Sequence, residues 1–253
     1  MLKPSISRSR GFKGGRLIWL ALGVATVCAA LVAPSAASAA GPSIEPVPTA
    51  PFTGAGAAAG ILEFKSGTKI GCEKYSTIGH WNTKQTGTVQ LKLEKCSSGC
   101  TTFGSASGTI ATQTVEFQLA YLNAAHTRFG WLLRPEWDPA KAALRKVLEE
   151  GGISESELEA LGFRLPFVKE LSCPGGGGYT KTLNGALIAE VLSPGLNKSV
   201  STNTLKFTTG TIEGTGHEYH LESEEPGGVM RERVKLEGQQ SVTYSDGAHR
   251  YSP

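Results

Sequence analysis

TIATQTVEFQLAYLNAAHTRFGWLLRP, residues 109–135, carries the pattern that decides the fold. Its apolar side chains fall on every second residue in two runs, which are Val115, Phe117, Leu119 and Tyr121, and then Phe129, Trp131 and Leu133. A period of two is that of a strand with one buried face, and a short polar break at 123–127 separates the runs. The sequence therefore predicts a β-hairpin whose aromatic face lies in the middle of an all-β core.

Alternating runs continue on both sides of this hairpin, from residue 61 to residue 96 and from residue 163 to residue 244. The segment 183–192 is apolar on both faces, so we expect that strand to be buried on both sides. Many short strands separated by glycine-rich turns predict one antiparallel all-β domain over residues 61–253, either a sandwich or a barrel.

Residues 138–162 interrupt the strand pattern and predict an insertion of two short helices. Asp138 followed by Pro139 is a typical helix start, and Ser154 with Glu157 has the spacing of a capping box. Apolar residues between 140 and 148 share one helical face. We expect this helix pair to cover an edge or an open end of the sheet.

The first 39 residues have the order of a secretory signal peptide. Five basic residues precede an apolar run at 17–32, and the small residues at 37–39 form a cleavage site. A retained membrane anchor is the alternative, but the apolar run is at the short limit of the roughly 17 residues that span a bilayer. We therefore expect a secreted, extracytoplasmic protein that is free of the membrane after cleavage. Residues 40–60, rich in Pro, Ala and Gly, are expected to form an unpacked linker.

The basic character of the chain belongs to this leader. The full chain has a formal net charge of +3, with 25 Lys and Arg against 22 Asp and Glu. The five basic residues of the leader leave 20 basic and 22 acidic residues, a net charge of −2. Because no basic cluster remains, the sequence does not indicate a nucleic-acid partner.

Four cysteines follow the leader: Cys72, Cys96, Cys100 and Cys173. An even number in an exported chain predicts two disulfides, for which three pairings exist. We favour Cys96–Cys100, because the three small residues 97–99 can make a tight turn, and this leaves Cys72–Cys173. A four-cysteine metal site needs paired C-x-x-C spacings, and the sequence has a single C-x-x-x-C.

Several of these strands follow one another in a recognisable order, namely ILEFKSGTKIGC (61–72), TGTVQLKLEKC (86–96), FGWLLRP (129–135), ELSCPGG (170–176) and NGALIAEVLSP (184–194). This order resembles a group of secreted proteins from high-GC actinobacteria, over about residues 60–135 and 163–245. The resemblance implies export and an all-β fold, and it implies no active site. The helical insertion is an addition to the shared plan.

Histidines and glutamates offer two candidate chemistries. His217 and His220 are three residues apart in a strand-like run, which would point them to opposite faces and does not favour a shared metal site. His249 lies near a turn and is expected to be solvated. Glu116 and Glu213 lie in predicted strands and are the carboxylates we consider for a glycosidase pair, although solvent-facing glutamate is the preferred interpretation.

Trp137 is the candidate binding residue, because an exposed tryptophan at a sheet rim can stack on a sugar ring or anchor a partner. The alternative is that it packs beneath the inserted helices. No catalytic residue, metal ligand or cofactor motif is assigned. The sequence thus favours an exported, non-enzymatic binding or structural module with an unknown extracellular or cell-envelope ligand. The alternative is a secreted, glycosidase-like hydrolase that uses paired glutamates.

Overall fold

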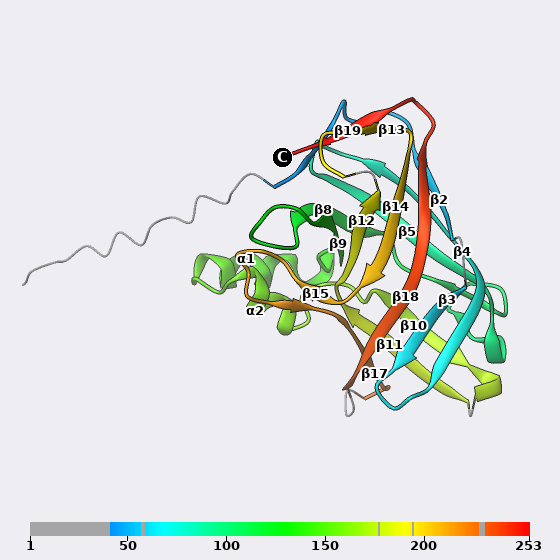
Figure 1. Cartoon of the computed structure of the whole chain (residues 1–253). Helices are drawn as coiled ribbons and strands as arrows, with labels where there is room; N and C mark the ends of the chain where they lie inside the picture. The colour runs from blue at the N-terminus through cyan, green and yellow to red at the C-terminus, as the bar shows by residue number, and fades with distance from the viewer. Residues whose placement is uncertain (1–40, 57–58, 177, 194, 228–230) are drawn as a thin grey trace, which may run out of the picture. The chain divides into compact units, whose positions relative to one another are not determined.

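The computed structural model describes residues 41–56, 59–176, 178–193, 195–227 and 231–253, which are mostly antiparallel β-strands (Figure 1). The predicted all-β class with a short helical insertion is confirmed. The predicted signal peptide, residues 1–39, lies outside the described residues. In the described ranges, no helix is long and apolar enough to cross a membrane.

Eight strands form a closed sheet, in which each strand pairs antiparallel with the next of the eight along the chain. They are β2 (Phe52–Gly56), β4 (Lys69–Trp81), β5 (Thr86–Cys96), β8 (Val115–Tyr121), β9 (Phe129–Pro135), β12 (Leu187–Ser193), β14 (Thr202–Thr208) and β18 (Arg231–Tyr244). The last strand, β18, pairs with both β14 and β2, and this closes the ring. Closure leaves the backbone groups along the ring paired with a neighbouring strand on each side.

The three longest strands, β4, β5 and β18, extend beyond the closed sheet and carry a second set of pairings. Here β3 (Gly60–Phe64) lies between β4 and β18, and β7 (Thr109–Ala111) pairs with β5. From β18 the sheet continues through β17 (Leu221–Glu224), β11 (Tyr179–Gly185), β10 (Val168–Cys173) and β6 (Thr101–Thr102). This extension supplies strands that border the candidate site.

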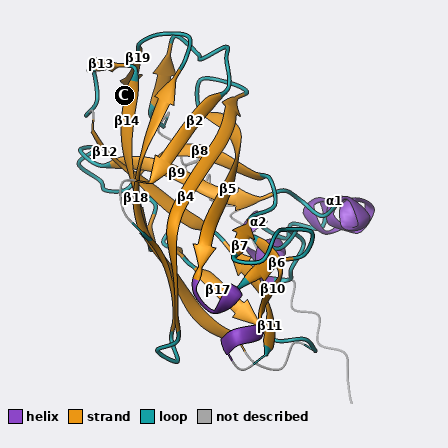
Figure 2. Cartoon of the chain, turned by 90° about the vertical axis from the view of Figure 1, so that its right-hand side faces the viewer, coloured by secondary structure: helices purple, strands orange, loops and turns teal. Residues whose placement is uncertain are grey.

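The insertion consists of a 3₁₀ turn, η2 (Pro139–Lys141), and the helices α1 (Ala142–Glu150) and α2 (Glu155–Ala160), which lie beside the strands (Figure 2). Both predicted helix starts are confirmed. The Asp138 carboxylate accepts a hydrogen bond from the Ala140 N–H, and the capping box of Ser154 and Glu157 is complete. Leu158 is the buried residue of the helix pair, whereas the apolar face of α1 stays exposed to solvent.

The predicted central hairpin is confirmed and supplies the aromatic core. β8 and β9 pair with Phe117 opposite Leu133, and the alternating side chains of both strands are buried. The rings of Phe117 and Trp131 stack with their centroids 4.6 Å apart, and Trp81 meets Phe117 edge-on at 4.7 Å. These rings fit because a facing position is glycine: a Cβ atom on Gly87 would lie 2.3 Å from the Phe117 ring.

Residues 41–56 belong to the fold, so the expectation of an unpacked linker over 40–60 is wrong for them. β1 (Ser43–Glu45) pairs with β19 (His249–Ser252), which also pairs with β13 (Ser199–Val200), and β2 belongs to the closed sheet. Ile44 and Phe52 are fully buried. The Pro- and Ala-rich composition of this segment does not predict the burial of Ile44 and Phe52, because that burial depends on strands far along the chain.

Asp246 and His249 hold this N-terminal segment from the other end of the chain. The Asp246 carboxylate accepts hydrogen bonds from the backbone N–H groups of Thr49 (2.6 Å) and Ala50 (3.2 Å) and lies 2.9 Å from Nε2 of His249. Burial opposes ionisation, but these bonds outweigh it and hold the pKa of Asp246 well below its usual range. The expectation that His249 is solvated is wrong, because the N-terminal segment covers it and its Nδ1 lies 2.7 Å from the Pro46 carbonyl oxygen.

The four predicted cysteines form two disulfides, but the pairing is Cys72–Cys96 and Cys100–Cys173, so the predicted pairs Cys72–Cys173 and Cys96–Cys100 are wrong. Cys72 and Cys96 stand opposite each other on β4 and β5. The turns η1 (Ser97–Gly99) and η3 (Pro174–Gly176) pack together, which places Cys100 beside Cys173. Strand register decides which sulfur atoms meet, and local spacing does not reveal it. Two intramolecular disulfides are typical of extracytoplasmic proteins.

Candidate functional site

A groove of about 720 Å³, which we call the insertion groove, is the candidate site. One wall is formed by α2 and by the residues that follow it, 161–166. The other wall is formed by residues 217–227, which include β17, and part of β11 also lines the groove. Its volume falls within the range of about 300–1,000 Å³ that is usual for small-molecule sites.

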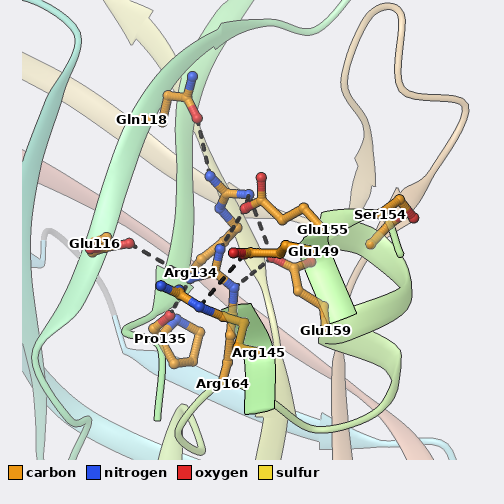
Figure 3. Close-up of polar contacts among 11 residues, drawn as sticks. Glu116, Gln118, Arg134, Pro135, Arg145, Glu149, Ser154, Glu155, Glu159 and Arg164 are labelled. Carbon is orange, nitrogen blue, oxygen red and sulfur yellow. Dashed lines mark hydrogen bonds and ion pairs between the residues drawn. The ribbon is translucent and has the colours of Figure 1, made fainter. Parts of the chain in front are cut away.

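The insertion wall is fixed by a network of arginine and glutamate side chains (Figure 3). Arg164, whose side chain is only 8% exposed, uses all three guanidinium nitrogens. Nε donates to Glu159 (2.6 Å), Nη2 donates to Glu155 (2.7 Å), and Nη1 donates to the Pro135 carbonyl oxygen (2.7 Å). The planar fork of donors suits this set of acceptors, so the buried charge is compensated and α2 is held in one orientation.

Arg134 of β9 completes the network from the side of the sheet (Figure 3). Its Nη1 donates to Glu155 (2.6 Å) and lies 3.4 Å from Glu159, while its Nη2 donates to the Gln118 side chain of β8 (3.1 Å). Glu155 and Glu159 can share these arginines because residues four apart lie on one face of a helix. Two arginines and two glutamates therefore neutralise each other along this wall.

Trp137, the expected binding residue, lies against the same network. The guanidinium carbons of Arg164 and Arg145 lie 3.9 Å and 4.6 Å from the centre of its ring, which are cation–π distances. Trp137 is half-buried and does not line the groove. This position fits the alternative interpretation, in which the ring packs beneath the helices, and a binding role for Trp137 stays a prediction.

The second wall carries aromatic and acidic side chains. A short hairpin of β15 (Gly210–Thr211) and β16 (Glu218–Tyr219) places Tyr219 there, and burial raises the pKa of its phenol, so the group is neutral at neutral pH. His217 meets the Tyr219 ring edge-on, with the ring centres 4.9 Å apart. His220 has Nε2 at 3.2 Å from the Glu222 carboxylate and Nδ1 at 3.2 Å from a backbone carbonyl oxygen.

His217 and His220 both line the insertion groove, although strand alternation predicted opposite faces. The reason is local: β16 ends at Tyr219 and β17 begins at Leu221, so the run is not one continuous strand. Over the part of the chain that the structure describes, no group of three His, Cys, Asp or Glu side chains is arranged to hold a metal ion.

The structure does not bring Glu116 and Glu213 together. The backbone N–H of Glu213 donates to the carbonyl oxygen of Tyr121, which lies five residues along β8 from Glu116, or roughly 16 Å at the rise of a strand. Glu213 pairs with His126 (2.8 Å), and Glu116 lies 3.6 Å from Arg164. The carboxyl groups of glycosidases are about 5–9.5 Å apart.

The arginines that organise this site were not identified from the sequence. A partial signal was present, because Glu155 and Glu159 have the four-residue spacing that places two carboxylates on one helix face. Their partner Arg134, however, comes from β9, and its side chain meets theirs only because the insertion folds back over that strand. Contacts of this kind depend on the tertiary fold.

No family model, curated protein or solved structure matches this chain. Three properties of the insertion groove bear on its function: its volume, the fixed orientation of its insertion wall, and the unequal charge of its two walls.

Proposed function

We propose that this chain is an exported, non-enzymatic binding module whose insertion groove takes a ligand that carries positively charged groups. Export is supported by the signal-peptide pattern of residues 1–39, by the resemblance to secreted actinobacterial proteins and by the two disulfides. The closed sheet acts as a rigid scaffold, and the insertion and the 217–227 segment form a recess on it.

The observation that carries this proposal is that the lysine and arginine side chains of the groove already have acceptors within the protein. Six carboxylates and four Lys or Arg side chains line the groove. Arg134 and Arg164 are committed to the glutamates of α2, and Lys141 donates to the Gly162 carbonyl oxygen (2.6 Å). The fourth, Arg231, is more than half exposed and lies 3.7 Å from Glu224. Little positive charge is left to attract an anion.

Carboxylates on the second wall retain free acceptor capacity. Glu222 has the His220 ring as its polar partner, and among the described residues no lysine or arginine forms an ion pair with Glu222 or Glu225. Arg233 stands opposite Glu222 on β18, but its guanidinium binds Glu218. An ionised carboxylate offers about four lone-pair positions. A ligand with ammonium or guanidinium groups would complement this wall, because opposite charges attract and charge-assisted hydrogen bonds are the stronger ones.

A binding role is favoured over the glycosidase-like alternative for a geometric reason. A glycosidase needs two carboxyl groups, one on each side of the scissile bond, and one of them needs a raised pKa. Glu116 lies near the start of β8, whereas the backbone of Glu213, in a turn after β15, bonds to Tyr121 at the other end of that strand. Glu155 and Glu159 are both engaged by the same two arginines, Arg134 and Arg164, which fix α2 to the sheet.

Fluorescence anisotropy with labelled hexalysine, hexaglutamate and a neutral Gly-Ser hexapeptide tests this proposal. We expect hexalysine alone to bind, with an affinity that falls as salt rises. The double substitution Glu222→Gln and Glu225→Gln should weaken it about tenfold, which corresponds to about 1.4 kcal/mol. A matched control, Glu73→Gln with Glu94→Gln on β4 and β5, removes one exposed and one partly exposed carboxylate outside the groove and should leave binding unchanged.

Two results would contradict the proposal. One is equal binding of hexalysine by the groove and control variants, which would indicate a general effect of net charge. The other is turnover of polysaccharide substrates by the purified protein, abolished by a Glu→Gln substitution, which would establish the hydrolase alternative instead.

A further inference from the structure

Phe103 is the most exposed large apolar side chain among the described residues, with 77% of its surface accessible. It lies after β6, on a turn closed by a hydrogen bond from the Ser105 N–H to the Thr102 carbonyl oxygen (2.9 Å). The Thr101 hydroxyl donates across the base of the turn to the Ala106 carbonyl oxygen (2.9 Å). The disulfide of Cys100 directly precedes this segment. The ring is therefore presented on a fixed support, so little conformational entropy would be lost on binding.

A small pocket of about 180 Å³ lies beside this ring. Hydroxyl and amide side chains make up most of its polar lining, with Ser105, Gln90 and Gln113 among them. Lys169 is the charged residue of the lining, which contains no carboxylate. The pocket thus differs in chemistry from the insertion groove, where charged groups dominate.

We propose that Phe103 and this pocket bind one ring of a neutral saccharide chain. A sugar ring has a face of C–H groups that can stack on an aromatic ring, and a rim of hydroxyl groups that both donate and accept hydrogen bonds. Phe103 supplies the stacking surface, and the amide of Gln113 supplies a donor and an acceptor. The Nε2 of Gln90 already donates to the Thr112 carbonyl oxygen (3.1 Å), which leaves the Gln90 amide oxygen as an acceptor for the ligand. The pocket volume is smaller than that of drug-sized ligand sites, which begin at about 300 Å³. We therefore expect one sugar ring to enter the pocket, while the rest of the saccharide continues over its open side.

Two other occupants suit this surface less well. Stable attachment to a lipid surface takes two signals, such as an apolar anchor and a polybasic patch. The lining of this pocket has one phenylalanine and one lysine, which is less than either signal requires. A protein partner of standard size needs about 800 Å² on each side, usually with several aromatic or arginine anchors. The residues around Phe103 are mostly Thr, Ser, Gly and Gln, which are typical of hydroxyl recognition.

Saturation-transfer NMR and titration calorimetry of the purified protein with cellohexaose, chitohexaose and maltohexaose test this site. We expect at least one hexasaccharide to bind. Phe103→Ala should weaken that binding at least tenfold, Phe103→Trp should retain it, and Gln113→Ala should weaken it. The matched control is Ile78→Ala on the outer face of β4, a side chain that is also more than half exposed, and it should bind like the parent protein. Because Phe103 is so exposed, its removal should leave the melting temperature within about 2 °C.

Three outcomes would overturn the inference. The first is the absence of binding to all three hexasaccharides at millimolar concentration. The second is binding that Phe103→Ala does not weaken. The third is sedimentation of the protein with phosphatidylcholine–phosphatidylglycerol vesicles that requires Phe103 and occurs without any saccharide binding, which would assign the ring to a lipid surface.

Discussion

Arg164 provides the sharpest test of how the insertion is held in place. Arg164→Met keeps most of the side-chain volume and removes three donated hydrogen bonds and the stacking on Trp137. It leaves Glu159, whose side chain is 18% exposed, with Arg134 at 3.4 Å as its cationic partner. We expect a clear loss of stability, because a partly buried carboxylate then lacks most of its compensation.

The size of the loss follows from burial. Removing one partner of a buried ion pair costs about 3–5 kcal/mol. Here Glu155 is more than half exposed, and Arg134 still contacts both glutamates, so we expect a value at the lower end, about 3 kcal/mol. For a domain of this size, 1 kcal/mol corresponds to about 2–4 °C, so the melting temperature should fall by about 6–12 °C.

Arg233→Met is the matched control. Arg233 also forms a bidentate pair, with Nη1 and Nη2 at 3.0 Å and 3.2 Å from the Glu218 carboxylate, but here both side chains are nearly half exposed, at 44% and 45%. An exposed pair of this kind contributes below about 1 kcal/mol. The two variants therefore make the same chemical change at similar geometry and differ mainly in burial.

Urea unfolding followed by tryptophan fluorescence measures both variants, and limited proteolysis locates any local loosening. In Arg164→Met we expect new cleavage within residues 138–162, because the insertion loses its main connection to β9. Equal losses of stability in the two variants, or an Arg164→Lys variant as stable as the parent protein, would refute the reasoning, since a lysine cannot reproduce the three directed bonds.

Two further expectations concern the core and pH. Gly87→Ala should destabilise the protein by about 2–3 kcal/mol, because its Cβ atom would lie 2.3 Å from the Phe117 ring. Gly71→Ala is the control: with open space around that position, it should change the free energy of unfolding by less than about 0.5 kcal/mol. Urea unfolding compares the two variants, and equal effects would contradict the packing argument. The lowered pKa of Asp246 means that its ionised form stabilises the fold above the unfolded-state pKa of about 3.9, and that this contribution is lost as the pH falls through the folded-state pKa. Asp246→Asn should therefore cost about 1–3 kcal/mol at pH 7 and clearly less at pH 2.5, and a cost that does not change with pH would argue against this assignment.

Local patterns were sufficient to predict much of the architecture. The alternation of Phe117 and Trp131 with polar neighbours gave the central hairpin and its buried face, because a strand repeats every two residues whatever its partner is. Asp138 and Ser154 gave both helix starts, since a cap bonds to N–H groups only two or three residues away. The apolar face of α1 was also visible, but its exposure was not, because periodicity does not say what covers a face.

The sequence by itself thus determined the all-β class, the place of the helical insertion and the participation of four cysteines in disulfides, all of which follow from composition or from contacts within a few residues. The tertiary structure alone decided that Cys72 meets Cys96, that β2 joins the closed sheet, and that Arg134 and Arg164 share the glutamates of α2. Each of these depends on strand register and on the closure of the ring. Strand register and ring closure are set by the burial of the whole core, so they cannot be predicted from the spacing of residues along a short segment.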